Sequence, residues 1–303
     1  MSAKTEETKE QVSLMEYSTL GRTEARVSHL GFGGAVLGLK NYLYEFDPVD
    51  ADDRRGLFDA VATALESGIN LFDTAAGYGN GESERVLGEA LAGVTDAAGE
   101  PLFISTKLSH DPSLSARQSL ERSLTNLRRD HVDIVQIHGD SYTPEDVDSI
   151  LAPGGVADQL QQLKDEGLTR FIGFTSEDDN DGVYRLVRSG RFDTMQICYN
   201  FIFQHPYEPS RPFGALFEAE KQGMGILTMR APTSGTFQRW IQMVNPHNTF
   251  DYTPALIQFV LSNPLVDVAL VGMRDAELVR KNVAIVADTA GRIDINAVHT
   301  RYV

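Results

Sequence analysis

Short apolar runs alternate along this chain with longer segments in which apolar residues recur every three or four positions. Such runs are typical of buried strands, and the longer segments have the period of a helix with one buried face. A hairpin is expected first, over residues 17–27, with its turn near residues 21–23. Eight strand–helix units follow it. The expected strands are 29–33, 70–73, 103–107, 132–138, 169–174, 194–199, 225–229 and 268–271, and the expected helices are 52–67, 83–91, 113–127, 156–166, 182–188, 213–222, 254–263 and 275–285.

This alternation predicts an α/β fold, a (β/α)8 TIM barrel with an N-terminal β-hairpin, rather than an open doubly wound sheet. No linker-like tract divides the chain, so residues 15–303 are expected to form a single domain after a flexible, polar segment 1–14. Two long stretches, 36–51 and 233–252, follow strands and would lie as loops over the C-terminal mouth of the barrel. Their aromatic residues would either line a pocket or pack the loops onto the rim: Tyr42, Tyr44, Phe46, Phe237 and Trp240.

Composition narrows the class of protein. The formal net charge of -16 argues against binding to nucleic acid, whose phosphates would be repelled. The acidic, lysine-poor composition fits either an ordinary acidic enzyme or an enzyme from a high-salt host. The single Cys198 lies in an apolar run and is expected in the core, so no disulfide framework is predicted.

The sequence predicts a cytoplasmic protein that acts on a small molecule. No apolar run approaches the roughly 20 residues that span a bilayer, and the polar N-terminus lacks the apolar centre of a signal peptide. The seven histidines and one cysteine show no metal-ligand spacing, so no metal site is expected. A GxGxxG dinucleotide fingerprint is also absent.

Four residues with proton-transfer chemistry follow or end successive predicted strands. The segment 70–91, NLFDTAAGYGNGESERVLGEAL, carries Asp73 at a strand end and Tyr78 in a glycine-rich turn, and later strands end at Lys107 and His138. A neighbouring ammonium lowers the pKa of a phenol from its usual value near 10, and a carboxylate would hold that ammonium in place. Taken alone, Tyr78 is more simply an aromatic residue that packs a loop, and Lys107 a lysine that ends a strand in solvent. His138 alone is more simply an interior histidine. Together at one barrel mouth they would polarise a carbonyl and protonate its oxygen.

The chain resembles the aldo-keto reductase family from about residue 17 to residue 285. The matching motifs are LGRT with VSHLGFGG, LFDTAAGYGNGESERVLGEAL, ISTK, VDIVQIH, FIGFTS, QICYN and VGMR, in family order and spacing. The resemblance implies a barrel that binds a nicotinamide cofactor without a Rossmann domain. It also implies a catalytic tetrad of Asp73, Tyr78, Lys107 and His138.

The resemblance further implies a set of cofactor contacts. Two positions depart from the usual family pattern: Ser176 stands where relatives have Asn, and Arg230 stands where many have an aromatic residue. The segment 231–235 would wrap the diphosphate with backbone amides. The implied cofactor-binding residues are Gly34, Ala35, Asp73, Thr175, Ser176, Gln196, Met229, Arg230, Ala231, Thr233, Gly235, Gly272, Arg274 and Asn282.

The implied contacts favour NADP(H) over NAD(H). In the resembling group the arginine of GxR, here Arg274, reaches the adenosine 2′-phosphate or stacks on the adenine. Asp275 follows it directly, and a carboxylate near that phosphate would be repulsive by roughly 1 kcal/mol in water.

The function expected from these features is reduction of an aldehyde or ketone to an alcohol by an NAD(P)H-dependent oxidoreductase, with Tyr78 as proton donor. Two alternatives remain open. One is an NAD-dependent sugar or polyol dehydrogenase, and the other is a non-catalytic, nicotinamide-binding partner subunit that resembles potassium-channel β subunits. An unrelated barrel for phosphorylated metabolites would leave Tyr78 and Lys107 without a role.

Overall fold

The computed structural model describes residues 15–42, 45–111, 113–209 and 213–300. The segment 1–14, expected to be flexible, and Tyr44, expected over the mouth, lie outside the described residues. The chain begins with strands β1 (Tyr17–Thr19) and β2 (Arg26–Ser28), which pair antiparallel around the short helix η1 (Gly21–Thr23). The predicted N-terminal hairpin is therefore confirmed.

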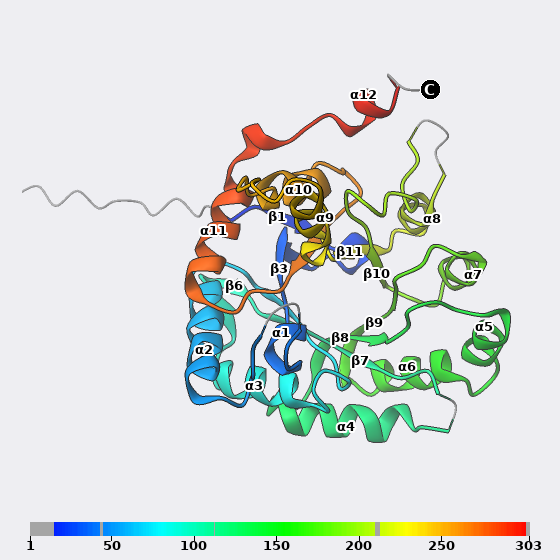
Figure 1. The fold of residues 1–303 in the computed structure, drawn as a ribbon. Coiled ribbons are helices and arrows are strands. Elements are labelled where there is room, and N and C mark those ends of the chain that lie inside the picture. The colour runs from blue at the N-terminus through cyan, green and yellow to red at the C-terminus, as the bar shows by residue number, and fades with distance from the viewer. Residues whose placement is uncertain (1–14, 43–44, 112, 210–212, 301–303) are drawn as a thin grey trace, which may run out of the picture.

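Eight parallel strands close into a barrel, in the order β10-β11-β12-β3-β4-β7-β8-β9 (Figure 1). Each barrel strand is hydrogen-bonded to the barrel strand that follows it in the chain, and β12 closes the ring against β3. The predicted (β/α)8 barrel is thus confirmed. The barrel strands are β3 (Leu30–Gly33), β4 (Leu71–Asp73), β7 (Phe103–Leu108), β8 (Val132–Ile137), β9 (Thr169–Ser176), β10 (Thr194–Cys198), β11 (Gly225–Met229) and β12 (Val268–Val271).

Helices surround the barrel as an outer ring (Figure 1). Several begin where the sequence supplies a side chain that caps the free backbone amides. Asp50 accepts from the amides of Asp52 and Asp53, and Ser115 accepts from that of Gln118. The helices are α1 (Ala35–Gly38), α2 (Ala51–Glu66), α3 (Glu82–Ala90), α4 (Ala116–Leu127), α5 (Pro144–Leu151), α6 (Val156–Asp165), α7 (Asp181–Arg188), α8 (Ala215–Lys221), α9 (Thr236–Val244), α10 (Thr253–Leu261), α11 (Ala276–Ala287) and α12 (Ile295–Thr300).

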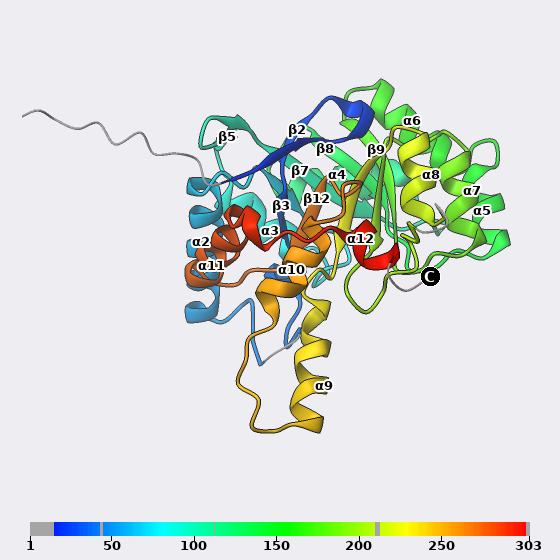
Figure 2. The same ribbon diagram turned by 90° about the horizontal axis from the view of Figure 1, so that it is seen from above.

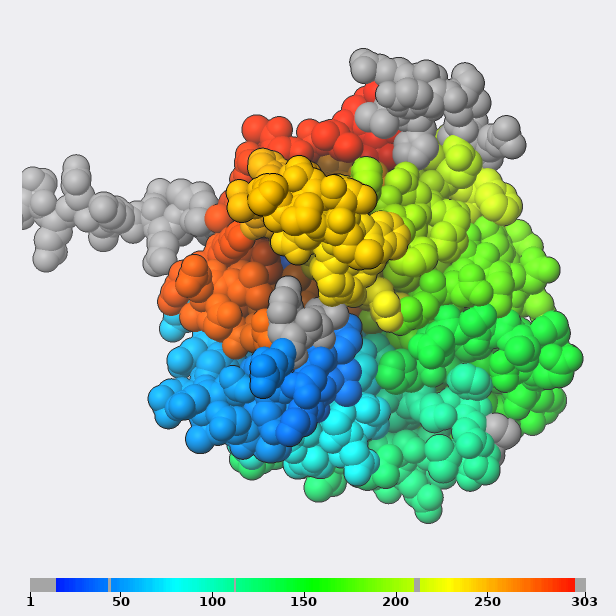
Figure 3. Space-filling model, in the orientation of Figure 1, coloured from blue at the N-terminus to red at the C-terminus, as the bar shows by residue number. Residues whose placement is uncertain are grey.

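The structure adds elements that the strand–helix count does not contain. Helix α5 lies in the connection after β8, and the small hairpin of β5 (Asp96–Ala97) and β6 (Glu100–Pro101) follows α3. The stretch 233–252, expected as a long loop, contains the short helix η2 (Thr233–Gly235) and then α9. Helix α9 has no buried residue and projects from the body of the barrel, as a raised yellow mass in Figure 3 and as an arm in Figure 2.

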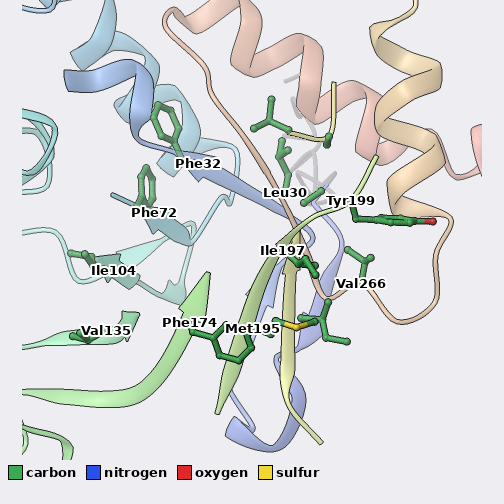
Figure 4. Packing of buried hydrophobic residues seen from close by; sticks show 14 of the residues in the cluster. Leu30, Phe32, Phe72, Ile104, Val135, Phe174, Met195, Ile197, Tyr199 and Val266 are labelled. Carbon is green, nitrogen blue, oxygen red and sulfur yellow. The ribbon is translucent and has the colours of Figure 1, made fainter. Parts of the chain in front are cut away.

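The main core lies between the barrel strands and the helices. Its side chains come from the outward face of the strands, for example Phe32 on β3 and Phe72 on β4, whose rings stack at 5.4 Å between centroids (Figure 4). Cys198 belongs to the buried residues at 2% exposure, as expected from its apolar run.

A second apolar cluster fills the amino-terminal end of the barrel. Leu20 and Val27 of the hairpin are fully buried there against Leu71 and Leu227 of the strands. The turn lies against the start of β11 so closely that a Cβ on Gly21 would come within 2.3 Å of the Gly225 nitrogen. The hairpin therefore plugs the end of the barrel opposite the projecting α9, as Figure 2 shows.

Candidate active site

The four predicted catalytic residues meet at the carboxyl end of the barrel. Asp73 is the last residue of β4, Lys107 is next to last in β7, and His138 follows β8 directly. Tyr78 reaches the same place from the connection between β4 and α3. All four line one cavity of about 300 Å³, the mouth cavity.

Lys107 carries a fully enclosed positive charge. Its side chain is 1% exposed, and its Nζ donates to Asp73 Oδ2 at 2.6 Å and to the carbonyl oxygen of Thr74 at 2.7 Å. Burial opposes this charge, but the Asp73 carboxylate and the Tyr78 oxygen outweigh it and raise the pKa of Lys107. The ammonium is therefore present at every physiological pH.

Tyr78 lies directly beside this ammonium, with Lys107 Nζ 5.1 Å from the centre of its ring. The sequence predicts that Lys107 lowers the pKa of the phenol, and this interaction is present. Burial is the larger effect, however, and together with the Asp73 carboxylate it raises the pKa of Tyr78 above its usual value. The phenol consequently keeps its proton at neutral pH and has it available for transfer.

His138 stands edge-on to Tyr78, with ring centroids 5.6 Å apart and an interplanar angle of 88°. Burial and the nearby Lys107 charge lower the pKa of His138 to about 4. The imidazole is therefore neutral at pH 7, so one ring nitrogen carries a hydrogen and can donate it to a substrate oxygen.

The connection that presents Tyr78 is fixed by the other residues of its motif. Ser83 Oγ donates to the carbonyl oxygen of Gly34, which ties this connection to the end of β3. Gly79 has a φ of +62°, and a Cβ there would lie 2.1 Å from the carbonyl oxygen of Gly38. Buried Glu84 accepts from the Thr106 hydroxyl at 2.8 Å. Much of the motif thus serves to hold the phenol in position.

A second, larger cavity adjoins the mouth cavity. This outer cavity has a volume of about 720 Å³ and shares Val36, Tyr42, Pro232, Ser234 and Gly272 with the mouth cavity. The two form a continuous groove from the tetrad to the amino-terminal end of α11. A long, extended ligand such as a dinucleotide fits this shape.

Most of the predicted cofactor residues line this groove. In the mouth cavity these are Gly34, Ala35, Asp73, Thr175, Gln196, Met229, Arg230 and Gly272, and in the outer cavity Gly235, Gly272, Arg274 and Asn282.

Three predicted contacts lie elsewhere. Ser176 is fully buried, and its hydroxyl donates to the carbonyl oxygens of Asp140 and Asp178. Ala231 and Thr233 are also buried outside the lining. The amide of Thr233 donates to the Arg230 carbonyl, and that of Gly235 to the Pro232 carbonyl. These two amides therefore complete local turns.

The buried amide of Asn282 supports a bound cofactor. This side chain is 1% exposed and lines the outer cavity, yet neither its Oδ1 nor its Nδ2 has a hydrogen-bond partner among the described residues. An unpartnered buried amide costs stability unless a ligand satisfies it. An adenine, which offers both donors and acceptors, fits that role. The residues present therefore suit a nicotinamide dinucleotide.

The charged residues at the edges of the groove are partly engaged already. Arg230, in the left-handed region at φ +63°, forms an ion pair with Glu177 from the loop after β9. Asp275 caps α11 by accepting from the Leu278 amide at 2.7 Å. Arg274 lies over the Phe46 ring at 5.4 Å, so this aromatic packs the loop onto the rim, whereas Tyr42 lines both cavities.

Sequence reasoning missed several supporting groups. The Thr74 carbonyl that binds Lys107 belongs to the backbone and leaves no signal in the sequence. Gln136 Nε2 donates to Gln196 Oε1 at 2.8 Å and so orients it. Both are buried polar residues, on β8 and β10, and β9 lies between these two strands. Glu177 follows FIGFTS directly, and an acid at a strand end was a usable signal for a partner of Arg230.

Fold and site together define a barrel enzyme built around a buried lysine–carboxylate pair and a phenol. The model of the Aldo/keto reductase family matches residues 29–298. The chain is 31% identical over 300 residues to L-galactose dehydrogenase from Arabidopsis thaliana, covering 90% of this chain and 89% of that protein. The chain belongs to the aldo/keto reductase family. It is an NAD(P)-dependent oxidoreductase that reduces carbonyl compounds by hydride transfer.

Solved structures agree on the fold. An aldo-keto reductase from Bacillus halodurans in its holo form superposes with a TM-score of 0.72 at 20% identity and 95% coverage of both chains. One from Klebsiella pneumoniae, in complex with NADP and acetate, gives a TM-score of 0.66 at 20% identity and 89% coverage of both chains.

In the described part of the chain, no three His, Cys, Asp or Glu residues gather in a way that could hold a metal ion. No described helix is long and apolar enough to cross a membrane.

Proposed function

We propose that the protein reduces a small aldehyde or ketone with Tyr78 as the proton donor. The observation that carries the proposal is the enclosed Lys107 ammonium, which is bonded to Asp73 and lies against the Tyr78 ring at the floor of the mouth cavity. Burial of such a charge is costly, and a cluster of this kind at a barrel mouth is typical of a catalytic site.

In this reaction the bound nicotinamide supplies the hydride, and the chain's own residues handle the proton. Neutral His138 donates a hydrogen bond to the carbonyl oxygen and holds it beside the Tyr78 hydroxyl. Tyr78 then transfers its proton to that oxygen as negative charge develops there. The Lys107 ammonium stabilises the resulting phenolate, and Asp73 keeps the ammonium in place.

NADP(H) is the proposed cofactor. Arg274 lines the outer cavity at the position where the resemblance puts the 2′-phosphate contact. The carboxylate of Asp275 is directed to the amide of Leu278 at the start of α11, which reduces its repulsion of a phosphate. The complex of the Klebsiella pneumoniae relative with NADP agrees with this choice.

Fluorescence titration with NADPH and NADH, followed by turnover of a panel of small aldehydes, tests the proposal. NADPH should bind more tightly, and Tyr78→Phe should lower kcat by roughly 100-fold or more with little change in NADPH affinity. Tyr252→Phe is the matched control, because it removes a phenol hydroxyl from a side chain outside the tetrad, whose ring packs against Phe237. Cofactor binding without turnover would instead favour the non-catalytic partner subunit.

Sugar oxidation is a second candidate, favoured by the similarity to L-galactose dehydrogenase. Tyr78 would then act as the base that removes the hydroxyl proton. Turnover of L-galactose and other aldoses with NAD, at a kcat/KM above that for any aldehyde with NADPH, would select this function.

The cytoplasmic location stays a prediction that subcellular fractionation tests.

A further inference from the structure

A third cavity, of about 420 Å³, opens beside the catalytic side chains. We call it the flank cavity. It shares Lys107 and His138 with the mouth cavity, so these two residues border both spaces. Its remaining wall comes mainly from the connections after β4 and β7 and from α4, and includes Gly77, Asn80, Ser109, Leu114, Ser119 and Arg122.

Arg122 is set apart by its lack of a partner. It lies in the middle of α4 and is exposed. Over the described ranges, Arg122 and Arg280 are the two arginines whose side chains have no hydrogen bond, ion pair or ring contact. An unpaired arginine on a helix surface is ordinary by itself. Arg122 differs because it lines a cavity that reaches His138.

The charge of the flank cavity is opposite to that of the protein. No described carboxylate lines it, whereas Asp251, Asp275 and Glu277 line the outer cavity. The charge of Lys107 is already neutralised by Asp73 at 2.6 Å, so Arg122 leaves the flank cavity with one uncompensated positive charge. In a chain with a formal net charge of -16, this is a local site for an anion.

We infer that Arg122 forms a subsite for an anionic group on the substrate, a carboxylate or a phosphate. The inference rests on the proposed carbonyl reduction. The aldehyde carbon and oxygen lie at Tyr78 and His138, and the rest of the substrate extends along the flank cavity to the guanidinium. Asn80, Ser109 and Ser119 offer hydrogen bonds to hydroxyl groups between the two ends. The volume of about 420 Å³ is large enough for a small metabolite.

The chemistry at the reacting end is unchanged by this subsite. Hydride from NAD(P)H forms the new C–H bond at the aldehyde carbon, and the Tyr78 proton forms the O–H bond. The products are the alcohol, still carrying its anionic group, and NAD(P)+. Tyr78 regains a proton from solvent. Arg122 is therefore a residue that determines specificity and takes no part in the bond changes.

Matched pairs of aldehydes test the subsite. The ratio of kcat/KM for 4-oxobutanoate to that for butanal measures recognition of a carboxylate, and the ratio for glyceraldehyde 3-phosphate to glyceraldehyde measures recognition of a phosphate. We expect at least one ratio to exceed about tenfold, because a hydrogen-bonded ion pair strengthens binding by that order. The larger ratio identifies the natural anion.

Substitutions then assign the preference to Arg122. Arg122→Gln should lower the charged-to-neutral ratio about tenfold, mainly through KM, and Arg122→Lys should keep part of it. Arg117→Gln removes the same charge from the same helix, where the side chain pairs with Glu166 away from the flank cavity. Its ratio should stay within about twofold of wild type.

A second measurement does not depend on turnover of the charged aldehydes. Succinate should inhibit butanal reduction competitively in the wild type, and at least tenfold more weakly in Arg122→Gln. Equal kcat/KM values for the charged and the neutral aldehyde of each pair in the wild type would overturn the subsite while leaving carbonyl reduction intact. The subsite would also be overturned if Arg117→Gln lowered the charged-to-neutral ratio as much as Arg122→Gln. Failure of every aldehyde to react would count against the proposed function instead.

Discussion

The two ends of the barrel bury side chains of opposite character, apolar at one end and charged at the other. At the amino-terminal end, Leu20 and Val27 fill the space between the strands with apolar side chains that need no partner. At the carboxyl-terminal end, a charged Lys107 is enclosed as completely as a core leucine. Burial of the apolar end is favourable, whereas burial of the ammonium is offset only by the geometry of its contacts.

The stability of the fold and its chemistry therefore depend on different ends of the barrel. We expect that the plug at the amino-terminal end can be weakened without an effect on the reacting groups, because no residue of the tetrad belongs to the apolar cluster there. The tetrad cannot be altered without loss of either the charge balance or the proton path. Substitutions at the two ends should therefore separate activity from stability, and the largest effects should arise where the charge is buried.

Lys107→Met should give the largest loss. Activity should fall by roughly 1,000-fold or more, because the Tyr78 phenolate loses the cation that stabilises it. The free energy of unfolding should fall by about 3–5 kcal/mol, because Asp73 is left as a buried charge without its partner. Steady-state kinetics and urea unfolding measure the two effects.

The double variant Lys107→Met with Asp73→Asn provides the control. It should recover a large part of the lost stability, because no uncompensated buried charge remains. It should remain inactive, because the Tyr78 phenolate still lacks its cation. A double variant as unstable as Lys107→Met would show that the unpaired Asp73 charge does not cause the loss of unfolding free energy.

Leu20→Ala should affect only the other end. Truncation of this fully buried side chain should cost about 2–5 kcal/mol of unfolding free energy. Its kcat and KM at 25 °C should equal those of the wild type. Val49→Ala, at a residue 68% exposed in the connection after β3, should cost less than about 0.5 kcal/mol. A change of KM in Leu20→Ala would contradict the independence of the two ends.

His138 should make the mouth sensitive to acid. Its pKa is about 4 in the folded protein and near 6.5 in an unfolded chain, so between these values the unfolded state binds a proton that the folded state does not. Its contribution to stability is therefore fully present above pH 6.5 and falls as the pH is lowered to 4, by at most about 3 kcal/mol. The difference in unfolding free energy between wild type and His138→Gln, measured from pH 7 to pH 4, isolates this effect. A constant difference would refute it.

Asp275→Asn should give the smallest effect. Asparagine caps a helix as well as aspartate does, so the stability should change by less than about 0.5 kcal/mol. Loss of the carboxylate should tighten NADPH binding by a few-fold, at most about 1 kcal/mol, and leave NADH binding unchanged. Asp288→Asn, at the opposite end of α11, should change neither affinity. Equal tightening for both cofactors would show that Asp275 does not act on the 2′-phosphate.

The sequence predicted the barrel and the positions of the tetrad because both follow from local patterns. Apolar strand runs end at Asp73, Lys107 and His138, and the carboxyl ends of parallel strands share one mouth. Helix α5 was missed although Thr143, Pro144 and Asp146 form a capping signature, because one helix was assigned to each strand.

Other features depend on contacts between distant loops and leave no local signal. The pairing of Arg230 with Glu177 joins residues 53 positions apart in the chain. The burial of Ser176 outside the groove involves a hydrogen bond to the carbonyl of Asp140 in another loop. The net rise in the pKa of Tyr78 depends on how completely the surrounding loops enclose it, which a motif alone does not specify.

Because Cys198 is buried, an introduced cysteine can be labelled in this protein without competition from the native thiol. Burial raises the pKa of its thiol to about 11, so almost no thiolate forms at neutral pH to react with maleimides or peroxide. A cysteine introduced at Met243, which is 79% exposed on α9, would then be the one reactive thiol of the protein. A dye at that position would report directly whether the projecting arm changes its surroundings when a cofactor or an aldehyde is added.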